Sequence, residues 1–176
     1  MNRPALLVSL TALSTLAVLA GCASTPSDHA VAEVRLAPTQ GNTATGLVTF
    51  TQHNGVIEVD AQVRGLSPGG HGFHIHEKGD CSAPDATSAG GHFNPGGHPH
   101  GHPDKDARHA GDLPMLVADA QGNASLKATL KGISLSAGSH AIVGRGLIVH
   151  AAPDDYTTQP TGNAGGRVAC AVITLR

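Results

Sequence analysis

The chain has 176 residues, with 11 lysine and arginine residues against 13 aspartate and glutamate residues, and only 14% of its residues are charged. Removal of an export leader at 1–21 would take away Arg3 alone among the charged residues and leave 155 residues with a net charge of −3. That balance excludes a strong electrostatic attraction to nucleic acid, and the length suits one domain with a single core.

Residues 1–21 have the pattern of an export signal. Arg3 supplies a short basic start, residues 5–20 are apolar, and Leu-Ala-Gly-Cys at 19–22 resembles the cleavage and lipidation motif of bacterial lipoproteins. We therefore predict a lipoprotein signal peptide at 1–21 and lipid on Cys22, in an exported, periplasmic protein held at a bacterial membrane. Ala23 favours the outer membrane. The alternative is ordinary cleavage near Ala20, which leaves Cys22 as an unmodified thiol.

After the leader, the composition changes twice. Residues 22–30 are mostly small and polar, which predicts a flexible tether between the lipid and a folded domain at 31–176. Within that domain, short apolar runs alternate with polar residues and are separated by glycine, asparagine and proline. In residues 56–64, for example, every second residue is apolar, which is typical of a strand with one buried face.

This pattern recurs often enough to predict the fold class. Eight strands are expected, at 31–37, 46–53, 56–64, 72–76, 113–119, 124–130, 140–149 and 167–175. Eight short strands, 23 glycines and no long helical period predict an all-β, eight-stranded barrel or sandwich. Two long segments, at 77–112 and 150–166, interrupt the strands, and their length favours functional loops.

Histidine is concentrated in residues 71–112, which hold eight of the twelve histidines. Imidazole is the commonest protein ligand for borderline transition metals. Alternate residues of a strand share a face, so His74 and His76 lie opposite the apolar Phe73 and Ile75 and can bind the same ion. His71 falls on the core side and is predicted to be buried and hydrogen-bonded, supporting the site without binding metal.

Further candidate ligands follow in the same segment: His92, His98, His100, His102, His109 and Asp112. Three imidazole nitrogens and one carboxylate oxygen would suit a tetrahedral structural zinc ion. The alternative is a loose histidine-rich loop that scavenges metal. The adjoining apolar strand, Cys81 and the glycines and prolines that fix turns favour an ordered site.

Two later positions extend this hypothesis. His150 ends a predicted strand, where a histidine is usually a surface or capping residue, but the face that carries His74 and His76 still lacks partners. Cys81 and Cys170 are an even pair once Cys22 is assigned to the lipid, and export favours a disulfide between them. Such a bridge would close a long loop and stabilise the fold. Arg167 alone indicates no function.

Four motifs in this order resemble those of the copper/zinc superoxide dismutases. They are GFHIHEKGDC at 72–81, GHFNP at 91–95, HAGDL at 109–113 and GNAGGRVAC at 162–170. The resemblance extends from about residue 31 to the C-terminus, and the lipidation motif is similar to that of exported bacterial members. It implies a Greek-key β-barrel and an enzyme that disproportionates superoxide anion, its small-molecule substrate, to oxygen and hydrogen peroxide. Copper and zinc would be the cofactors, and a homodimer is compatible with it.

The resemblance also implies residue roles. Copper would be bound by His74, His76, His92 and His150, and zinc by His92, His100, His109 and Asp112. As catalytic residues, His92 would bridge the metals and exchange a proton, and Arg167 would orient superoxide. Asp154 would link copper and zinc histidines, and Cys81–Cys170 matches the family disulfide. Of the three alternating histidines, His100 alone has the family spacing from His92 and to His109; His98 and His102 have no implied role.

The resemblance leaves two matters open. The loop at 151–166 has no lysine or glutamate, so the charges that steer substrate in eukaryotic members are absent there. Whether Lys78, Lys105 or Arg108 replaces them is undecided by the sequence. The alternative function is a copper-free or metal-buffering protein of the same fold, including copper delivery through His98, His100 and His102. The presence of all four copper-side histidines favours the enzyme.

Overall fold

A computed structural model of the chain describes residues 29–176. The predicted signal peptide at 1–21, the lipid on Cys22 and nearly all of the predicted tether lie outside these residues. The first strand begins at Ala30, one residue before the predicted start of the domain. Within residues 29–176, no helix is long and apolar enough to cross a membrane.

Strands make up the regular structure of the described residues, which confirms the predicted all-β fold. The elements are β1 (Ala30–Pro38), β2 (Thr45–His53), β3 (Val56–Arg64), β4 (Gly69–His71), β5 (Phe73–His76), the 3-10 helix η1 (Thr87–Ala89), β6 (Leu116–Ala118), β7 (Ala124–Leu130), β8 (Gly146–His150) and β9 (Arg167–Val172).

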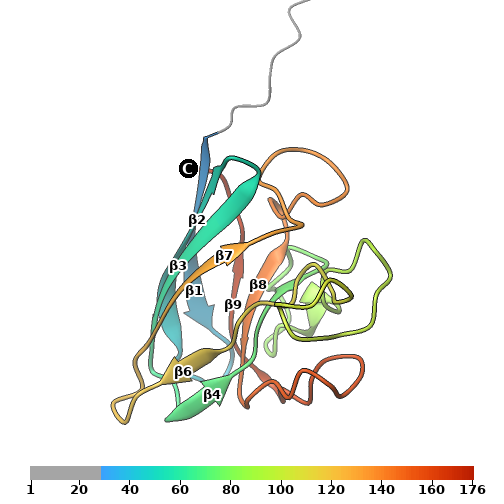
Figure 1. Cartoon of the computed structure of the whole chain (residues 1–176). Helices are drawn as coiled ribbons and strands as arrows, with labels where there is room; N and C mark the ends of the chain where they lie inside the picture. Colours follow the sequence, from blue (N-terminus) through green and yellow to red (C-terminus); the bar gives the residue numbers. More distant parts are fainter. Residues whose placement is uncertain (1–28) are drawn as a thin grey trace, which may run out of the picture.

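Seven of these strands form one curled antiparallel sheet, in the order β5-β8-β9-β1-β2-β3-β7 (Figure 1). β1 belongs to both halves of this sheet, because residues 30–36 pair with β2 whereas Ala37 and Pro38 pair with Cys170 and Ala169 of β9. The change of partner folds the sheet over on itself. β4 and β6 pair as a separate ribbon at one end (Figure 1). The result is a barrel of the predicted class.

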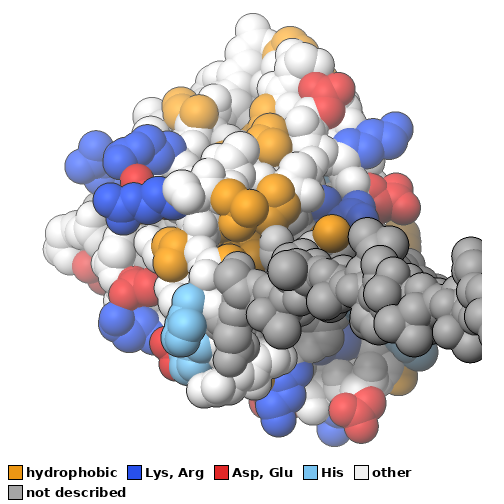
Figure 2. All heavy atoms as spheres, turned by 90° about the horizontal axis from the view of Figure 1, so that it is seen from above, with side chains coloured by type: hydrophobic (Ala, Val, Ile, Leu, Met, Phe, Trp, Pro, Cys, Tyr) orange, Lys and Arg blue, Asp and Glu red, His pale blue; other side chains and the backbone are white. Residues whose placement is uncertain are grey.

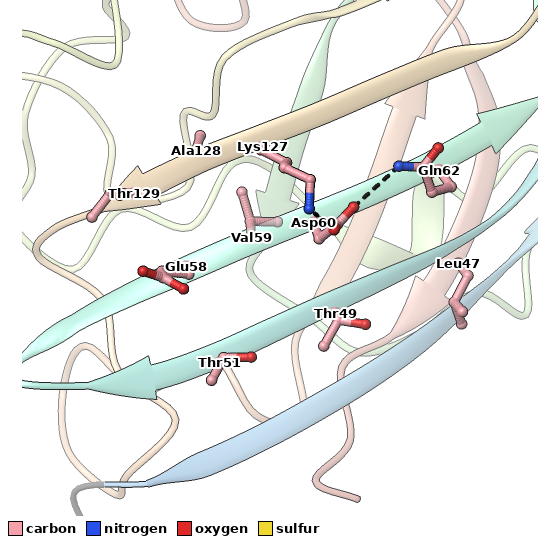
Figure 3. Close-up of a pocket in the computed structure, with 10 residues that line it drawn as sticks. All are labelled: Leu47, Thr49, Thr51, Glu58, Val59, Asp60, Gln62, Lys127, Ala128 and Thr129. Carbon is pink, nitrogen blue, oxygen red and sulfur yellow. Dashed lines mark hydrogen bonds and ion pairs between the residues drawn. The ribbon is translucent and has the colours of Figure 1, made fainter.

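The outer faces of β2, β3 and β7 are polar and face solvent. Figure 2 shows another side, the end at the top of Figure 1, where hydrophobic side chains lie in the middle and basic and acidic ones lie around them. A shallow groove crosses the three strands, and Thr49, Thr51 and Glu58 lie in it beside an ion pair in which Lys127 Nζ is 2.5 Å from Asp60 Oδ2 (Figure 3). The residues that line this groove come from these strands alone, so it is separate from the predicted metal site.

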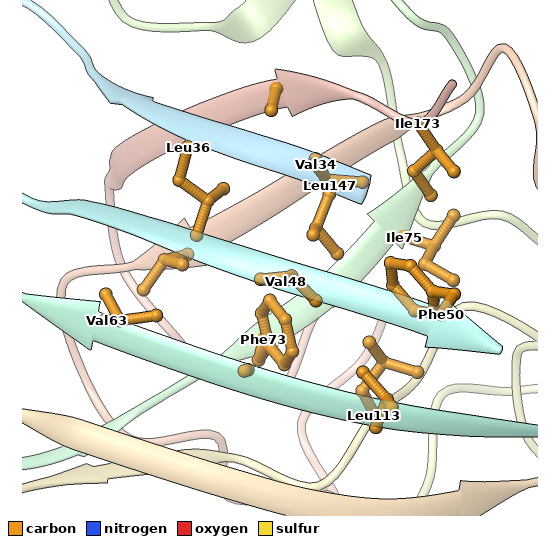
Figure 4. Close-up of a cluster of buried hydrophobic side chains, with 14 of the residues drawn as sticks. Val34, Leu36, Val48, Phe50, Val63, Phe73, Ile75, Leu113, Leu147 and Ile173 are labelled. Carbon is orange, nitrogen blue, oxygen red and sulfur yellow. The ribbon is translucent and has the colours of Figure 1, made fainter. Parts of the chain in front are cut away.

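The core lies between the two halves of the folded sheet. Phe50 of β2 and Phe73 of β5 are fully buried there, among aliphatic side chains such as Val48, Leu113 and Leu147 (Figure 4). Each such side chain contributes roughly 1.5–3 kcal/mol by leaving water. The chain has only four phenylalanine and tyrosine residues. Valine, isoleucine, leucine and alanine therefore fill most of the core, as their share of the sequence indicates.

Several strand bounds differ from the prediction because turns interrupt the apolar pattern. The expected strand at 140–149 begins only at Gly146, since Gly144 has a φ of +81° and Arg145 N donates to Ile142 O at 3.1 Å. The expected strand at 113–119 shortens to β6 because Pro114 lacks an N–H and Met115 N donates to the Tyr156 hydroxyl instead. The expected strand at 167–175 ends at Val172.

The layer formed by β5, β8 and β9 is buried on both faces. Every residue of β5 and β8 is buried, although only alternate side chains meet the core. The segment 77–112 covers the opposite face, where Ala86 and Ala89 pack against Ile148 and Cys170. A disulfide between Cys81 and Cys170 fastens this cover to β9, which confirms the predicted pairing. The covered face is the one that carries the predicted metal ligands.

Candidate metal centre

Pairing between β5 and β8 sets the floor of the centre. His74 pairs with Ile148 and His76 with Gly146, so both imidazoles project from the covered face, as strand parity predicts. The segment 77–112 returns to β5 at two points: His92 bridges to His76, and Asp112 to His74. Its backbone is fixed there, because Phe93 N donates to Ile75 O at 2.8 Å. Ligands far apart in sequence are thereby held next to the strand.

An irregularity in β9 brings Arg167 to the same face. Val149 pairs with Ala169 but His150 pairs with Arg167, so Val168 is an extra residue in β9. Val168 packs against the core, which turns Arg167 toward the covered face beside His150. Bulges of this kind re-aim side chains next to functional sites.

The first group of candidate ligands consists of His74, His76, His92 and His150. One nitrogen of each lies within 4.8 Å of the corresponding nitrogens of the others, and all four residues are buried. His74 Nδ1 and His92 Nε2 are buried and have no hydrogen-bond partner within residues 29–176. His76 Nε2 lies 3.4 Å from His150 Nε2. Buried nitrogens without partners are costly unless a cation binds them, so this group fits a metal ion.

Hydrogen bonds on the far side of each ring fix which nitrogen faces the group. His76 Nδ1 donates to Gly90 O at 2.9 Å, and His150 Nδ1 donates to Gly165 O at 3.2 Å. A carbonyl only accepts, so in both residues Nε2 is left with its lone pair toward the group. His74 Nε2 lies 2.6 Å from Asp154 Oδ2, which leaves Nδ1 facing inward. Such partners hold metal-binding imidazoles in one tautomer.

The second group consists of His92, His100, His109 and Asp112. Asp112 Oδ1 is 2.9 Å from His92 Nδ1, 3.0 Å from His100 Nδ1 and 3.4 Å from His109 Nδ1. The other carboxylate oxygen, Oδ2, accepts from the backbone N–H groups of Gly101 and His109. Three nitrogens and one oxygen within 4.8 Å of one another suit tetrahedral zinc.

His92 is the one residue that belongs to both groups. Its Nδ1 faces the second group and its Nε2 faces the first, so a single ring joins two adjacent ion sites. Asp154 joins them again from outside. Its Oδ2 lies 2.6 Å from His74 Nε2 and its Oδ1 lies 2.9 Å from His100 Nε2. This is the linking geometry that the sequence resemblance implies for Asp154.

Burial keeps the imidazoles of the first group neutral. Together with a smaller effect of neighbouring rings, it lowers the pKa of His76 to about 2, of His150 to about 3 and of His92 to about 4. Burial alone would raise the pKa of Asp112, but hydrogen bonds from His100, His109 and His92 hold it well below its ordinary value. Neutral imidazole and ionised carboxylate are the forms that bind metal.

Arg167 is held rigidly at the edge of the first group. Its guanidinium donates to Ala86 O at 2.5 Å and to Gly90 O at 2.6 Å. Gly90 O also accepts from His76 Nδ1, so one carbonyl fixes both the arginine and a candidate ligand. The neighbouring positive charge of Arg167 lowers the pKa of His76 and His150 after burial and ring–ring effects. Arg167 therefore places a cation next to the group.

Of the remaining predicted residues, one histidine is buried beside the centre and two are exposed outside it. His71 is buried, with Nδ1 2.7 Å from His150 O and Nε2 2.8 Å from Ser67 O, so it supports the strand that carries His150. His98 and His102 are exposed and lie outside both groups. Sequence reasoning missed Gln159, which bonds to both backbone polar groups of His100 across 59 residues. No local pattern in the sequence indicates that contact.

Comparison with known proteins identifies the family that this fold and site define. A family model described as copper/zinc superoxide dismutase matches residues 44–173, and the chain therefore belongs to that family. The chain is also similar to a solved structure described as the clock protein EA4. That match has 42% identity and a TM-score of 0.77, and it covers 86% of this chain and 98% of the other.

Copper and zinc are the cofactors of this family, and the two groups fit them. The first offers four neutral imidazoles, two of them with an unpartnered nitrogen among the described residues, and imidazole suits copper. The second offers three imidazoles and a carboxylate, which suits zinc in a closed structural site. The fit rests on the donor atoms of this chain and on their burial.

Proposed function

We propose that the protein is a superoxide dismutase, an enzyme that converts two superoxide anions to oxygen and hydrogen peroxide. The observation that carries the proposal is the position of His92 between two groups of buried ligands. Copper would be held by His74, His76, His92 and His150, and zinc by His92, His100, His109 and Asp112. When bound, copper supplies the one-electron redox chemistry, which zinc lacks.

His92 is suited to hold and release a proton at Nε2. Its Nδ1 faces the second group, where zinc would hold it, so the ring would keep its orientation when Nε2 changes its bonding. Nε2 is buried and has no partner among the described residues. A proton carried there would lie where peroxide is to be formed, which makes His92 the proposed proton donor.

Arg167 is suited to attract and orient the anion. Its two hydrogen bonds to carbonyl groups hold the guanidinium in place without neutralising its charge. A fixed cation beside the first group raises the local concentration of a small anion and keeps it close to the ligands. Electrostatic steering of substrate is already known for superoxide dismutases as a class, and the placement of Arg167 agrees with it.

The rival function is a metal-buffering or copper-free protein of the same fold. Its weak external site would use His98 and His102 with His100, but His98 and His102 are exposed and lie outside both groups. The complete set of buried histidines around His74 Nδ1 and His92 Nε2 favours the enzyme over the buffer.

The decisive experiment is to load the purified protein with copper and zinc and follow the decay of superoxide. Rapid decay that is lost in His150→Ala supports the proposal, with His140→Ala as an exposed control. No activity in fully metallated protein would contradict the proposal, as would undiminished activity in His150→Ala.

Location and assembly are part of the same proposal. The leader at 1–21 and the motif at Cys22 support export and a lipid anchor at a bacterial membrane, with Ala23 favouring the outer one. Mass spectrometry of the N-terminal peptide would test this, because acyl chains on Cys22 support it and a free thiol contradicts it. A homodimer is consistent with the family, and sedimentation of the soluble domain measures it.

A further inference from the structure

Three histidines alternate in residues 98–102, and only one of them reaches the zinc group. In an extended segment, residues two apart share a face, so His98, His100 and His102 could all turn the same way. Only His100 is buried, with Nδ1 3.0 Å from Asp112 Oδ1, whereas His98 and His102 are exposed. Something outside the segment must select the middle histidine.

Gln159, on the loop at 151–166, holds the backbone of His100. Its Oε1 accepts from His100 N at 2.8 Å, and its Nε2 donates to His100 O at 2.9 Å. The amide thus bonds to both backbone groups of one residue, as a neighbouring strand would. A slip by two residues would bring equivalent backbone groups of a neighbouring histidine to the amide, but both groups of His98 are already bonded to the Asn94 side chain. The two amides therefore hold the segment in one register together.

The same loop shapes the space around the His100 ring. His100 Nε2 is 2.9 Å from Asp154 Oδ1, and Gly162 lies directly above, where an added Cβ would overlap Asp154 Oδ1 and lie 2.6 Å from His100 Nε2. On the outer side, Tyr156 contacts the His102 ring edge-on at 4.6 Å between centroids. The loop therefore admits His100 to the interior and holds His102 outside.

We propose that Gln159 is a positioning residue that selects His100, and neither His98 nor His102, as the histidine of the zinc group. The inference rests on the proposed function for the assignment of zinc to this group. Gln159 acts through the backbone of His100 and touches no ligand atom. Loss of Gln159 should allow the segment to slip, so that a neighbouring histidine shares the site.

The test measures zinc binding by the copper-free whole chain, using competition with a chromophoric chelator. Gln159→Ala should lower zinc affinity about tenfold, the lower end of the effect of groups that orient ligands. Gln159→Glu keeps the acceptor for His100 N and loses the donor to His100 O, so it should have an intermediate affinity. Thr157→Ala is the matched control on the same loop, because it removes a hydroxyl that bonds to Asp155 and keeps the backbone carbonyl that accepts from Gln159 Nε2.

A second measurement separates selection from a merely structural role. His98→Ala and His102→Ala are each made in two proteins, the wild type and Gln159→Ala. Neither should change zinc affinity when Gln159 is present, and at least one should lower it several-fold when Gln159 is absent. Cobalt(II) in place of zinc should give an altered visible spectrum in Gln159→Ala and an unaltered one in Thr157→Ala.

Two results would overturn the inference. One is a zinc affinity of Gln159→Ala within about twofold of the wild type. The other is a lower zinc affinity of Gln159→Ala that does not change when His98 or His102 is also replaced by alanine. His100→Ala with unchanged zinc affinity would overturn the ligand assignment and the inference with it. If the zinc tests give the expected results but the protein loaded with copper and zinc removes no superoxide, the proposed function alone is contradicted.

Discussion

Asp154 is the residue on which both halves of the centre depend, although it lies outside both groups of candidate ligands. Its two oxygens accept from His74 Nε2 and His100 Nε2, and Oδ1 also accepts from Tyr156 N at 2.8 Å. Burial alone would raise its pKa, but the hydrogen bonds from His100 and His74 lower it well below the ordinary value. The carboxylate therefore stays ionised and fixes one ring in each group.

Replacement of Asp154 by Asn should weaken both metal sites. An amide has one oxygen and one NH2 group, so it can accept from only one of the two imidazole N–H groups and opposes the other. We expect zinc and copper affinity to fall by about 10- to 100-fold, as for other groups that orient ligands. Competition titration with a chelator measures both. Asp119→Asn, at an exposed turn with no contact to the centre, should leave both affinities unchanged.

At the level of single residues, the sequence predicted those whose chemistry is visible in their type. The seven predicted ligands lie in two adjoining groups, although their roles as ligands stay predictions. Cys81 and Cys170 pair as expected. Gln159 and Tyr156 were not predicted, because an ordinary glutamine or tyrosine shows its function only through partners 41 to 59 residues away.

The loop at 151–166 is the element that completes the centre, and Asp155 organises its turn. The Asp155 carboxylate accepts from the hydroxyl and the N–H of Thr158 and from the N–H of Thr157, all between 2.6 and 2.9 Å. These bonds stabilise the ionised form and lower the pKa of Asp155 from 3.8 to about 2. The charged form of Asp155 therefore stabilises this turn.

The stabilisation by Asp155 should depend on pH. Because the folded pKa is lowered, the contribution is complete above the unfolded pKa near 3.8 and disappears as pH falls through about 2. Denaturant unfolding of metal-free wild type and Asp155→Asn should show the wild type more stable at pH 5, with the difference shrinking between pH 4 and 2. A difference that is constant over this range would contradict the account.

Strand prediction was accurate where one face of a strand meets solvent, because the period of two is then visible, as in β3. It was less accurate for β8, which is buried on both faces and begins six residues after the predicted start. It could not place the bulge at Val168 either, because a bulge depends on the partner strand and not on the residue type. The position of Arg167 follows from that bulge, so its role came only from the resemblance.

At the level of the molecule, the barrel core and the metal centre lie on opposite faces of β5 and β8. Phe50→Ala, which empties a fully buried position in β2, should lower the free energy of unfolding by about 3–5 kcal/mol. The cobalt(II) spectrum of the folded protein should stay unaltered, because Phe50 lies in the barrel core, outside both groups of candidate ligands. Urea unfolding measures the first effect. Thr49→Ala, on the outer face of the same strand, should change stability by less than about 0.5 kcal/mol.

The disulfide connects stability of the whole molecule to one side of the centre. Cys81 and Cys170 are 89 residues apart, so their bond restricts much of the unfolded chain, and replacing both by serine should cost about 2–5 kcal/mol. The bond also fastens the segment that carries Ala86 and Gly90, whose carbonyls hold Arg167 and the His76 ring. In the second group, the His100 ring is held by Asp154, which lies on the loop at 151–166 and outside the segment 77–112.

The Cys81→Ser/Cys170→Ser protein should therefore lose copper affinity to a greater extent than zinc affinity. Loosening of Gly90 frees the His76 ring to rotate, whereas the hydrogen bond from His100 Nε2 to Asp154 remains. Competition titrations of copper and zinc, made below the unfolding midpoint of the variant, compare the two losses directly. Equal losses at both metals would show that the disulfide stabilises the barrel as a whole and has no separate influence on the copper side.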